Sequence, residues 1–137
     1  MKGWSLALVT MVFGILVAAS PAAGEQAISF RQQIRPIRST NCFKCHGPDS
    51  QSREANLRLD RFEDAVAHHE GHSTLVPGNA ESSELYRRIT STDDSKQMPP
   101  PESNKHLTEE QRELLRRWIN EGGKYEANWA FVRLHGR

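Results

Sequence analysis

The chain has 137 residues with 18 basic and 17 acidic side chains, so its formal net charge is only +1. This balance excludes a strongly basic nucleic-acid-binding protein, and it gives no reason to expect electrostatic attachment to a membrane surface. The length allows one domain, and only 34 of the 114 residues from Gly24 onward are apolar, about 30%, which is little for a core that must support itself.

Residues 1–23 have the layout of a secretory signal peptide. Lys2 supplies the basic start, an uncharged apolar run follows, and small residues close the segment between Ala18 and Ala23. An uncleaved membrane anchor is the alternative, because the run approaches spanning length. The small-residue exit favours cleavage, so we expect a periplasmic or otherwise exported protein that contacts a membrane only if this segment is retained.

The first helix is expected to begin at Ser29. The spacing of Ser29 and Gln32 matches a capping box, and Pro36 should kink the helix or restart it. Its apolar face is formed by Phe30, Ile34 and Ile37. Since the helix would run into Cys42, this face leads directly to a cysteine pair.

Cys42, Cys45 and His46 form a C-x-x-C-H sequence, which is the attachment pattern of c-type haem. Two thiols at this spacing can reach the two vinyl groups of one porphyrin and form thioethers, and the adjacent imidazole then projects onto the iron as proximal ligand. A disulfide between these cysteines would close a very small loop and add little stability. The sequence therefore predicts one covalent haem c.

The cysteine pair has three alternative interpretations, and each is weaker. A thioredoxin-like redox pair would sit in a βαβ pattern, and no apolar β-branched run flanks this one. A structural zinc site needs four ligands, and the chain has no second cysteine pair. A chance match is disfavoured by the predicted export to a compartment where haem is attached.

Met98 is the leading candidate for the sixth position on the iron. It begins a Met-Pro-Pro-Pro run, and three prolines stiffen the backbone into an extended strap. It is also the only methionine after residue 23, and Met/His ligation is an established pairing in cytochromes c. A gap-filling core position or a surface position in a Pro-rich loop is the alternative.

Histidines are the other candidates for that position. They are His68, His69, His72, His106 and His135. The composition around the first three indicates an exposed polar loop, and His106, next to a predicted helix start, is expected at the surface.

The remaining elements are short. Residues 62–66 suggest a helical turn, residues 81–89 a second helix, and Thr108 with Gln111 a capping box that opens the final helix. Its apolar stripe consists of Leu107, Leu114, Leu115, Trp118 and Ile119. Gly122 and Gly123 should end it, and we interpret Trp118 as a packing residue. The result is an all-α fold of three or four short helices without a sheet.

Several further segments carry a family pattern. They are Ile34-Arg35-Pro36-Ile37, Asn41 through Gly47 with Pro48-Asp49, Leu57-Arg58-Leu59-Asp60, Pro77-Gly78, Ser83-Glu84-Leu85 with Arg88-Ile89, Met98-Pro99-Pro100-Pro101, and Leu114 through Gly122. With these segments, residues 30–131 resemble the planctomycete-type cytochrome c domain. The resemblance implies the class I cytochrome c fold, in which the first and last helices cross above the haem, with His46 and Met98 as axial ligands.

Some positions depart from the family pattern. Arg38 stands where an apolar residue is usual, Asn56 where glycine is common, and Asn128 where the closing segment has histidine. Residues 68–72 replace a typically Gly-rich loop. In the family this module usually precedes much larger domains, so the chain is either a stand-alone carrier or the front piece of a longer protein. We divide it into a signal peptide (1–23), a cytochrome c domain (25–127) and a C-terminal tail (128–137) that would begin a linker.

One-electron transfer is the predicted function, with an exposed haem edge that meets a redox partner protein or domain in small, transient contacts. A haem enzyme or sensor is the alternative. It would bind a small ligand or peroxide at an open sixth position, which requires Met98 to be off the iron or readily displaced. A thiol oxidoreductase is a third hypothesis. The pattern favours a carrier over a catalyst, and because the haem would supply much of the missing apolar surface, we expect the domain to be largely unfolded without it.

Overall fold

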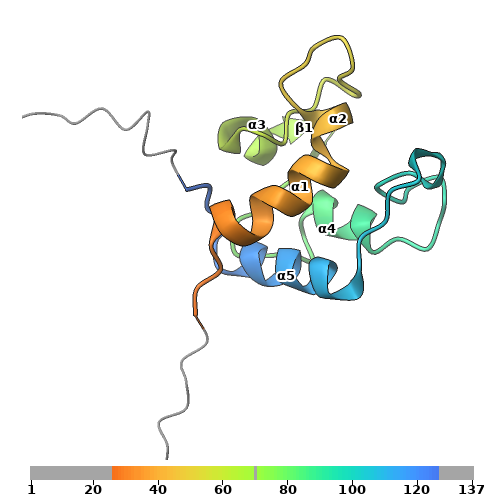
Figure 1. Ribbon diagram of the computed structural model, residues 1–137. Helices are drawn as coiled ribbons and strands as arrows, with labels where there is room; N and C mark the ends of the chain where they lie inside the picture. Colours follow the sequence, from red (N-terminus) through yellow and green to blue (C-terminus); the bar gives the residue numbers. More distant parts are fainter. Residues whose placement is uncertain (1–25, 70, 127–137) are drawn as a thin grey trace, which may run out of the picture.

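The computed structural model describes residues 26–69 and 71–126, and this part of the chain is largely helical (Figure 1). A π-helical turn comes first, and five α-helices and one 3-10 turn follow in the described residues. They are η1 (Phe30–Ile34), α1 (Arg35–Asn41), α2 (Phe43–His46), α3 (Phe62–Val66), α4 (Glu84–Ile89), η2 (Pro101–Ser103) and α5 (Glu109–Asn120). The count of α-helices exceeds the predicted three or four because the chain departs from helical geometry at Cys42, which separates α1 from α2.

A small antiparallel hairpin forms where the sequence predicted a loop and no sheet. Strand β1 (His68–His69) pairs with strand β2 (His72–Ser73), and Gly71 adopts a φ of 85° in the turn between them. The expectation of an exposed segment is confirmed, since His68 and His72 are exposed. The expectation of a chain without a sheet is wrong. The sequence did not reveal the hairpin, because strands of two residues are too short to show an alternation of polar and apolar residues.

The N-terminal helix begins at Ser29 as predicted, but its second capping partner differs. The Ser29 hydroxyl accepts from the Gln32 N–H at 3.3 Å, whereas the Ser29 N–H donates to the side chain of Gln33, at 2.9 Å, rather than to that of Gln32. The wider π-helical turn of η1 accounts for this shift of one residue. Pro36 lies in the first turn of α1, where no intrahelical donor is lost, so the predicted restart is confirmed.

Helix α5 has the predicted ends. The Thr108 hydroxyl accepts from the Gln111 N–H at 3.2 Å, and the Gln111 side chain accepts from the Thr108 N–H at 3.0 Å. After Asn120 the chain reverses through Gly122 and Gly123, whose φ angles are 110° and 58°. Both angles lie in the left-handed region that favours glycine.

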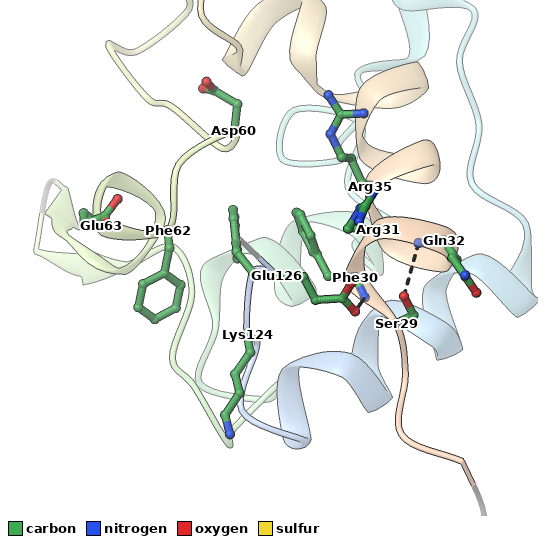
Figure 2. A pocket seen from close by; sticks show the side chains of 11 residues that line it. Ser29, Phe30, Arg31, Gln32, Arg35, Asp60, Phe62, Glu63, Lys124 and Glu126 are labelled. Atoms are coloured by element: carbon green, nitrogen blue, oxygen red, sulfur yellow. Dashed lines mark hydrogen bonds between the residues drawn. The ribbon is translucent and has the colours of Figure 1, made fainter. Parts of the chain in front are cut away.

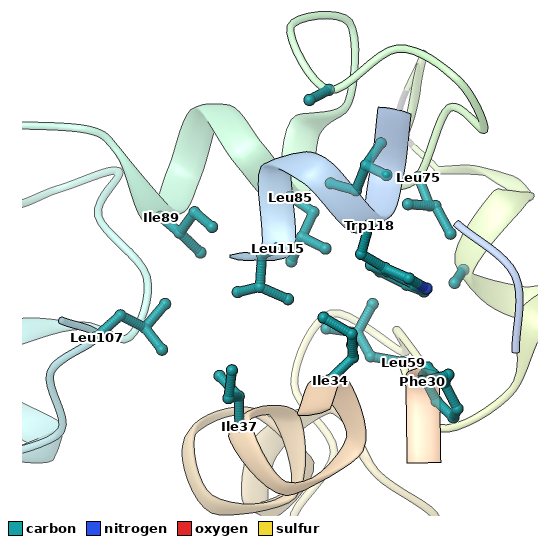
Figure 3. Close-up of a cluster of buried hydrophobic side chains, with 13 residues drawn as sticks. Phe30, Ile34, Ile37, Leu59, Leu75, Leu85, Ile89, Leu107, Leu115 and Trp118 are labelled. Carbon is teal, nitrogen blue, oxygen red and sulfur yellow. The ribbon is translucent and has the colours of Figure 1, made fainter. Parts of the chain in front are cut away.

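The hydrophobic core lies between the N-terminal helices, α4 and α5 (Figure 3). Its buried members are Phe30, Ile34, Ile37, Leu59, Ala65, Leu75, Ala80, Leu85, Ile89, Leu107, Leu115, Trp118 and Ile119. Trp118 is only 2% exposed, and its ring centroid lies 5.7 Å from that of Phe30, which joins α5 to η1. The indole Nε1 donates to the carbonyl of Lys124 at 3.0 Å. The packing role predicted for Trp118 is confirmed.

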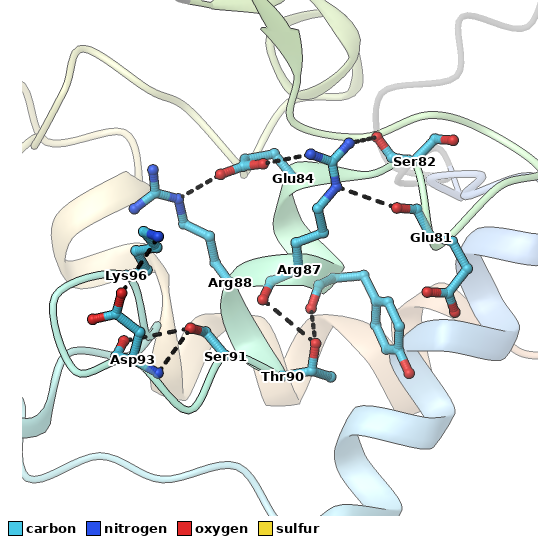
Figure 4. Close-up of polar contacts among 10 residues, drawn as sticks. Glu81, Ser82, Glu84, Arg87, Arg88, Thr90, Ser91, Asp93 and Lys96 are labelled. Carbon is cyan, nitrogen blue, oxygen red and sulfur yellow. Dashed lines mark hydrogen bonds and ion pairs between the residues drawn. The ribbon is translucent and has the colours of Figure 1, made fainter.

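Helix α4 has a charged outer side, whose polar contacts are shown in Figure 4, and an apolar inner side with buried residues. Glu84 forms ion pairs with Arg88 at 2.9 Å and with Arg87 at 3.5 Å. Partly exposed pairs of this kind stabilise a helix by only a few tenths of a kcal/mol each. Leu85 and Ile89 are buried in the core, and their burial holds the helix in place, at about 1.5–3 kcal/mol for each side chain.

Among residues 26–69 and 71–126, no helix is both long and apolar enough to cross a membrane. The predicted signal peptide (1–23), the tail (128–137) and His135 lie outside the described residues.

Candidate functional site

Cys42, Cys45 and His46 lie on one helical turn. The N–H groups of Cys45 and His46 both donate to the carbonyl of Cys42, at 3.2 and 2.8 Å. Both cysteines are free thiols, and all three side chains are half-buried. The structure therefore brings together three of the four predicted site residues.

Gly47 ends this turn at a position with no room for a side chain. A Cβ placed there would lie 2.1 Å from the carbonyl oxygen of Phe43. The sequence indicates no role for Gly47 beyond its place in the family pattern, although a glycine directly after a helical turn is a recognised stop signal. The close approach of Gly47 to Phe43 lets the chain leave the helix immediately after His46.

The loop that follows wraps back onto the motif. The N–H of Glu54 donates to the carbonyl of Cys45, and the N–H of Leu59 donates to the carbonyl of His46, both at 2.8 Å. The Arg53 guanidinium donates to the carbonyl of Gly47 at 3.1 Å. These bonds satisfy the backbone carbonyls of the motif and leave its thiols and imidazole as the groups available to a ligand.

The imidazole of His46 has an unpaired nitrogen. Its Nδ1 is buried and has no hydrogen-bond partner among the described residues. Burial lowers the pKa of His46, against the opposing effect of the nearby backbone carbonyls of Leu57 and Glu54. A neutral imidazole at pH 7 has a lone pair that can bind a metal ion. A buried nitrogen without a hydrogen-bond partner is rare in proteins and supports the binding of a ligand by this side chain.

The thiol of Cys42 lies in a different electrostatic setting. Burial raises the pKa of this thiol, against the lowering effect of the positive charges of Arg38 and Lys105. Reactive redox cysteines have lowered pKa values and sit in electropositive, partly open surroundings. The raised pKa of Cys42 is the opposite of what an active dithiol needs.

Met98 lies in a strap whose backbone is tied to α4 and whose following segment is tied to α1. The Met98 N–H donates to the carbonyl of Arg88 at 3.0 Å, and the Lys105 ammonium donates to the carbonyl of Thr40, near the end of α1. Met98 is half-buried, and its peptide bond to Pro99 is cis. These two bonds tie the strap to α4 and the segment after the strap to the end of α1.

A surface pocket of about 970 Å³ lies elsewhere, between η1, the start of α3 and residues 124–126 (Figure 2). Aromatic rings and both signs of charge line it, among them Phe30, Phe62, Arg35 and Glu63. None of the four predicted site residues contributes to its walls. This pocket is therefore separate from the C-x-x-C-H turn.

A comparison with protein families gives a match that includes this motif. The family model described as Planctomycete cytochrome C matches residues 42–102, a range that contains the whole C-x-x-C-H turn and Met98. The chain is similar to this family over these residues. The predicted resemblance is thus confirmed for this range, and a cytochrome c family implies haem c as the cofactor. No curated protein and no solved structure matches the chain.

The residues of the matched segment fit a haem c. The two thiols and the imidazole occupy one turn, the His46 Nδ1 is an orphaned buried polar atom, and the carbonyls of Cys42, Cys45 and His46 already have partners. Three further residues shape the surroundings of the predicted site residues, and the sequence did not predict these roles. Arg88 accepts from the Met98 N–H, Lys105 donates to Thr40, and Gly47 ends the C-x-x-C-H turn. Only the tertiary contacts of the first two with the strap and α1 identify them.

Proposed function

We propose that this chain is an exported c-type cytochrome that carries one electron at a single, covalently bound haem. The observation that carries the proposal is the C-x-x-C-H turn inside the segment matched by the planctomycete cytochrome C family. A haem held there would supply one-electron chemistry, the exchange between ferric and ferrous iron. The near-neutral charge of the chain fits a protein partner better than a nucleic acid.

The roles of the motif residues follow from their types and positions. Cys42 and Cys45 would each form a thioether to the porphyrin, and His46 would supply the proximal nitrogen. Their placement on one turn and the unpaired Nδ1 of His46 support these roles. A covalent link would fix the distance between the porphyrin and the backbone. The imidazole, next in the chain to Cys45, would then be held close to its ligand position.

Met98 is our proposed distal ligand. Its strap is tied to Arg88 and the segment after the strap to Thr40, and a half-buried thioether is available for a metal contact. With both axial positions filled, little rearrangement would accompany each electron, which suits a carrier better than a catalyst. Methionine ligation also raises the reduction potential of a haem.

The class I cytochrome c fold is part of the same proposal. Its defining feature is the contact between the first and last helices, and here the Phe30 ring of η1 lies 5.7 Å from the Trp118 ring of α5. Leu115 and Ile119 extend the same buried face of α5. This packing supports an arrangement in which the two helices cross beside the haem-binding turn.

The proposed partner is a redox protein or domain outside the cytoplasm, reached through an exposed haem edge. Small transient interfaces are usual for electron-transfer pairs. The proposed export depends on residues 1–23 as a signal peptide, with a membrane contact only where that segment is retained.

Covalent haem is tested by expressing the full chain with haem-attachment machinery and extracting the product with acidic acetone. We expect the haem to stay with the protein, because thioethers survive the treatment. The Cys42→Ser/Cys45→Ser double variant, expressed in the same way, should release any haem it holds. Release of haem from the wild-type chain, or a product without haem, would contradict the proposal.

A further inference from the structure

Arg38 is a buried cation one helical turn before the haem-binding cysteines. Its side chain is only 1% exposed, and the N–H of Cys42 donates to its carbonyl at 2.7 Å. A helical turn rises about 5.4 Å, so the Arg38 backbone is within one turn of the first predicted thioether. Arg38 also stands at a position where the family resemblance predicts an apolar residue.

The hydrogen bonding of this guanidinium is incomplete. Its Nη2 donates to the carbonyl of Leu59, which also accepts from the Tyr125 hydroxyl at 2.9 Å. The Nε and Nη1 groups have no partner among the described residues. The acceptors that the structure gives Arg38 are the Leu59 carbonyl and the Tyr125 hydroxyl. Both are neutral, and neutral dipoles only partly offset a full positive charge.

Four aromatic rings surround the guanidinium, and we call them the aromatic cage. The guanidinium carbon lies 4.8, 5.3, 5.8 and 5.9 Å from the ring centroids of Tyr125, Trp118, Phe43 and Phe30. Ring faces attract a cation, so the cage stabilises the charge without neutralising it. A cage of rings also keeps water away, and a charge in such surroundings acts over a longer distance than one in solvent.

We propose that Arg38 is an electrostatic tuning residue, whose buried positive charge favours the ferrous state and so raises the reduction potential. The proposal rests on the proposed function, because it needs a haem at Cys42 and Cys45. Reduction lowers the positive charge at the iron by one unit, and a fixed cation nearby therefore destabilises the ferric state more than the ferrous state. A role in packing alone would affect stability but would not depend on the charge.

Three single variants of the haem-loaded full chain separate charge from packing. Arg38→Met removes the charge and keeps a long side chain, while Arg38→Lys keeps the charge. Arg35→Met removes a charge from an exposed position on the same helix, and solvent screens such a charge. The reduction potential of each is measured by spectroelectrochemical titration, in low and in high salt.

We expect Arg38→Met to lower the ferrous-to-ferric ratio at a fixed potential about tenfold, which is about 59 mV for one electron. The Arg38→Lys potential should stay near the wild-type value, and the Arg35→Met potential should change little. High salt should leave the Arg38→Met difference in place, because the charge is buried.

A wild-type potential in Arg38→Met with an intact spectrum would overturn the proposal. An equal loss in Arg38→Lys would also overturn it, because the effect would then follow packing rather than charge. Where Arg38→Met does not fold, Arg38→Gln replaces it, since a glutamine amide can still donate to Leu59 and carries no charge. A wild-type chain without haem would instead contradict the proposed function itself.

Discussion

Gly47 is the single residue on which the exit from the C-x-x-C-H turn most directly depends. A Cβ at this position would lie 2.1 Å from the Phe43 oxygen. This oxygen belongs to the backbone of the helical turn, so it can move only if the turn itself is distorted. We therefore expect Gly47→Ala to destabilise the haem-loaded protein by about 1–3 kcal/mol, the usual cost of overpacking, and to reduce haem loading. Urea unfolding measures the first effect and the haem absorbance per protein the second.

Gly78→Ala is the matched control for Gly47→Ala. Gly78 has a φ of 84° and open space around the added Cβ, so the change brings only backbone strain, about 1–2 kcal/mol. Haem loading should stay unchanged in this variant. Equal haem loading in Gly47→Ala and Gly78→Ala would show that the close contact with Phe43 does not matter for the site.

Met98→Ala tests the proposed distal ligand at the same scale. The oxidised spectrum should lose its methionine-ligation signature, and the reduction potential should fall because the thioether no longer favours ferrous iron. Cyanide and carbon monoxide should bind faster to the opened position. Gln97→Ala, next in the chain and also half-buried, serves as the control and should keep the wild-type spectrum. An unchanged spectrum in Met98→Ala would move the sixth ligand to a histidine.

Helix α5 owes its start to a capping box, and the contribution of this cap can be measured at the scale of the element. Thr108→Ala removes the hydroxyl that accepts from the Gln111 N–H, which should cost about 1 kcal/mol in urea unfolding. Thr108→Ser should restore most of the loss, since serine keeps the oxygen. Thr92→Ala, at an exposed position after α4, should change stability by less than the cap variant. Equal losses at the two threonines would mean that the cap does not stabilise α5.

The elements differ in how well the sequence predicted them. The cap at Thr108, the restart at Pro36 and the glycines after α5 were all predicted, because each depends on residues within a few positions of one another. The hairpin was missed and the break at Cys42 was not foreseen, because neither leaves a periodic pattern. The shift of the Ser29 cap from Gln32 to Gln33 depends on the π-helical turn, which no spacing rule indicates.

The whole molecule has a small core for its length. Only about 30% of the residues after position 23 are apolar, and a covalent haem would add a large apolar surface to the side chains that pack around it. We expect the Cys42→Ser/Cys45→Ser chain to be largely unfolded at 25 °C, as measured by circular dichroism and hydrogen exchange. Cys45→Ser alone keeps one thioether and should retain more structure than the double variant. A haem-free chain that unfolds cooperatively, with the midpoint of the loaded protein, would contradict this expectation.

By itself, the sequence was enough to predict the helix ends and the family resemblance, and it also carries the C-x-x-C-H pattern, because each of these features depends on contiguous residues. Tertiary structure alone decided how the distant parts meet. Lys105 reaches Thr40 across 65 positions and Arg38 reaches Leu59 across 21, and no local pattern encodes such contacts. In the sequence Arg38 was only a departure from a family pattern. Its burial inside the aromatic cage depends on rings from η1, α2, α5 and the segment after α5, which only folding brings together.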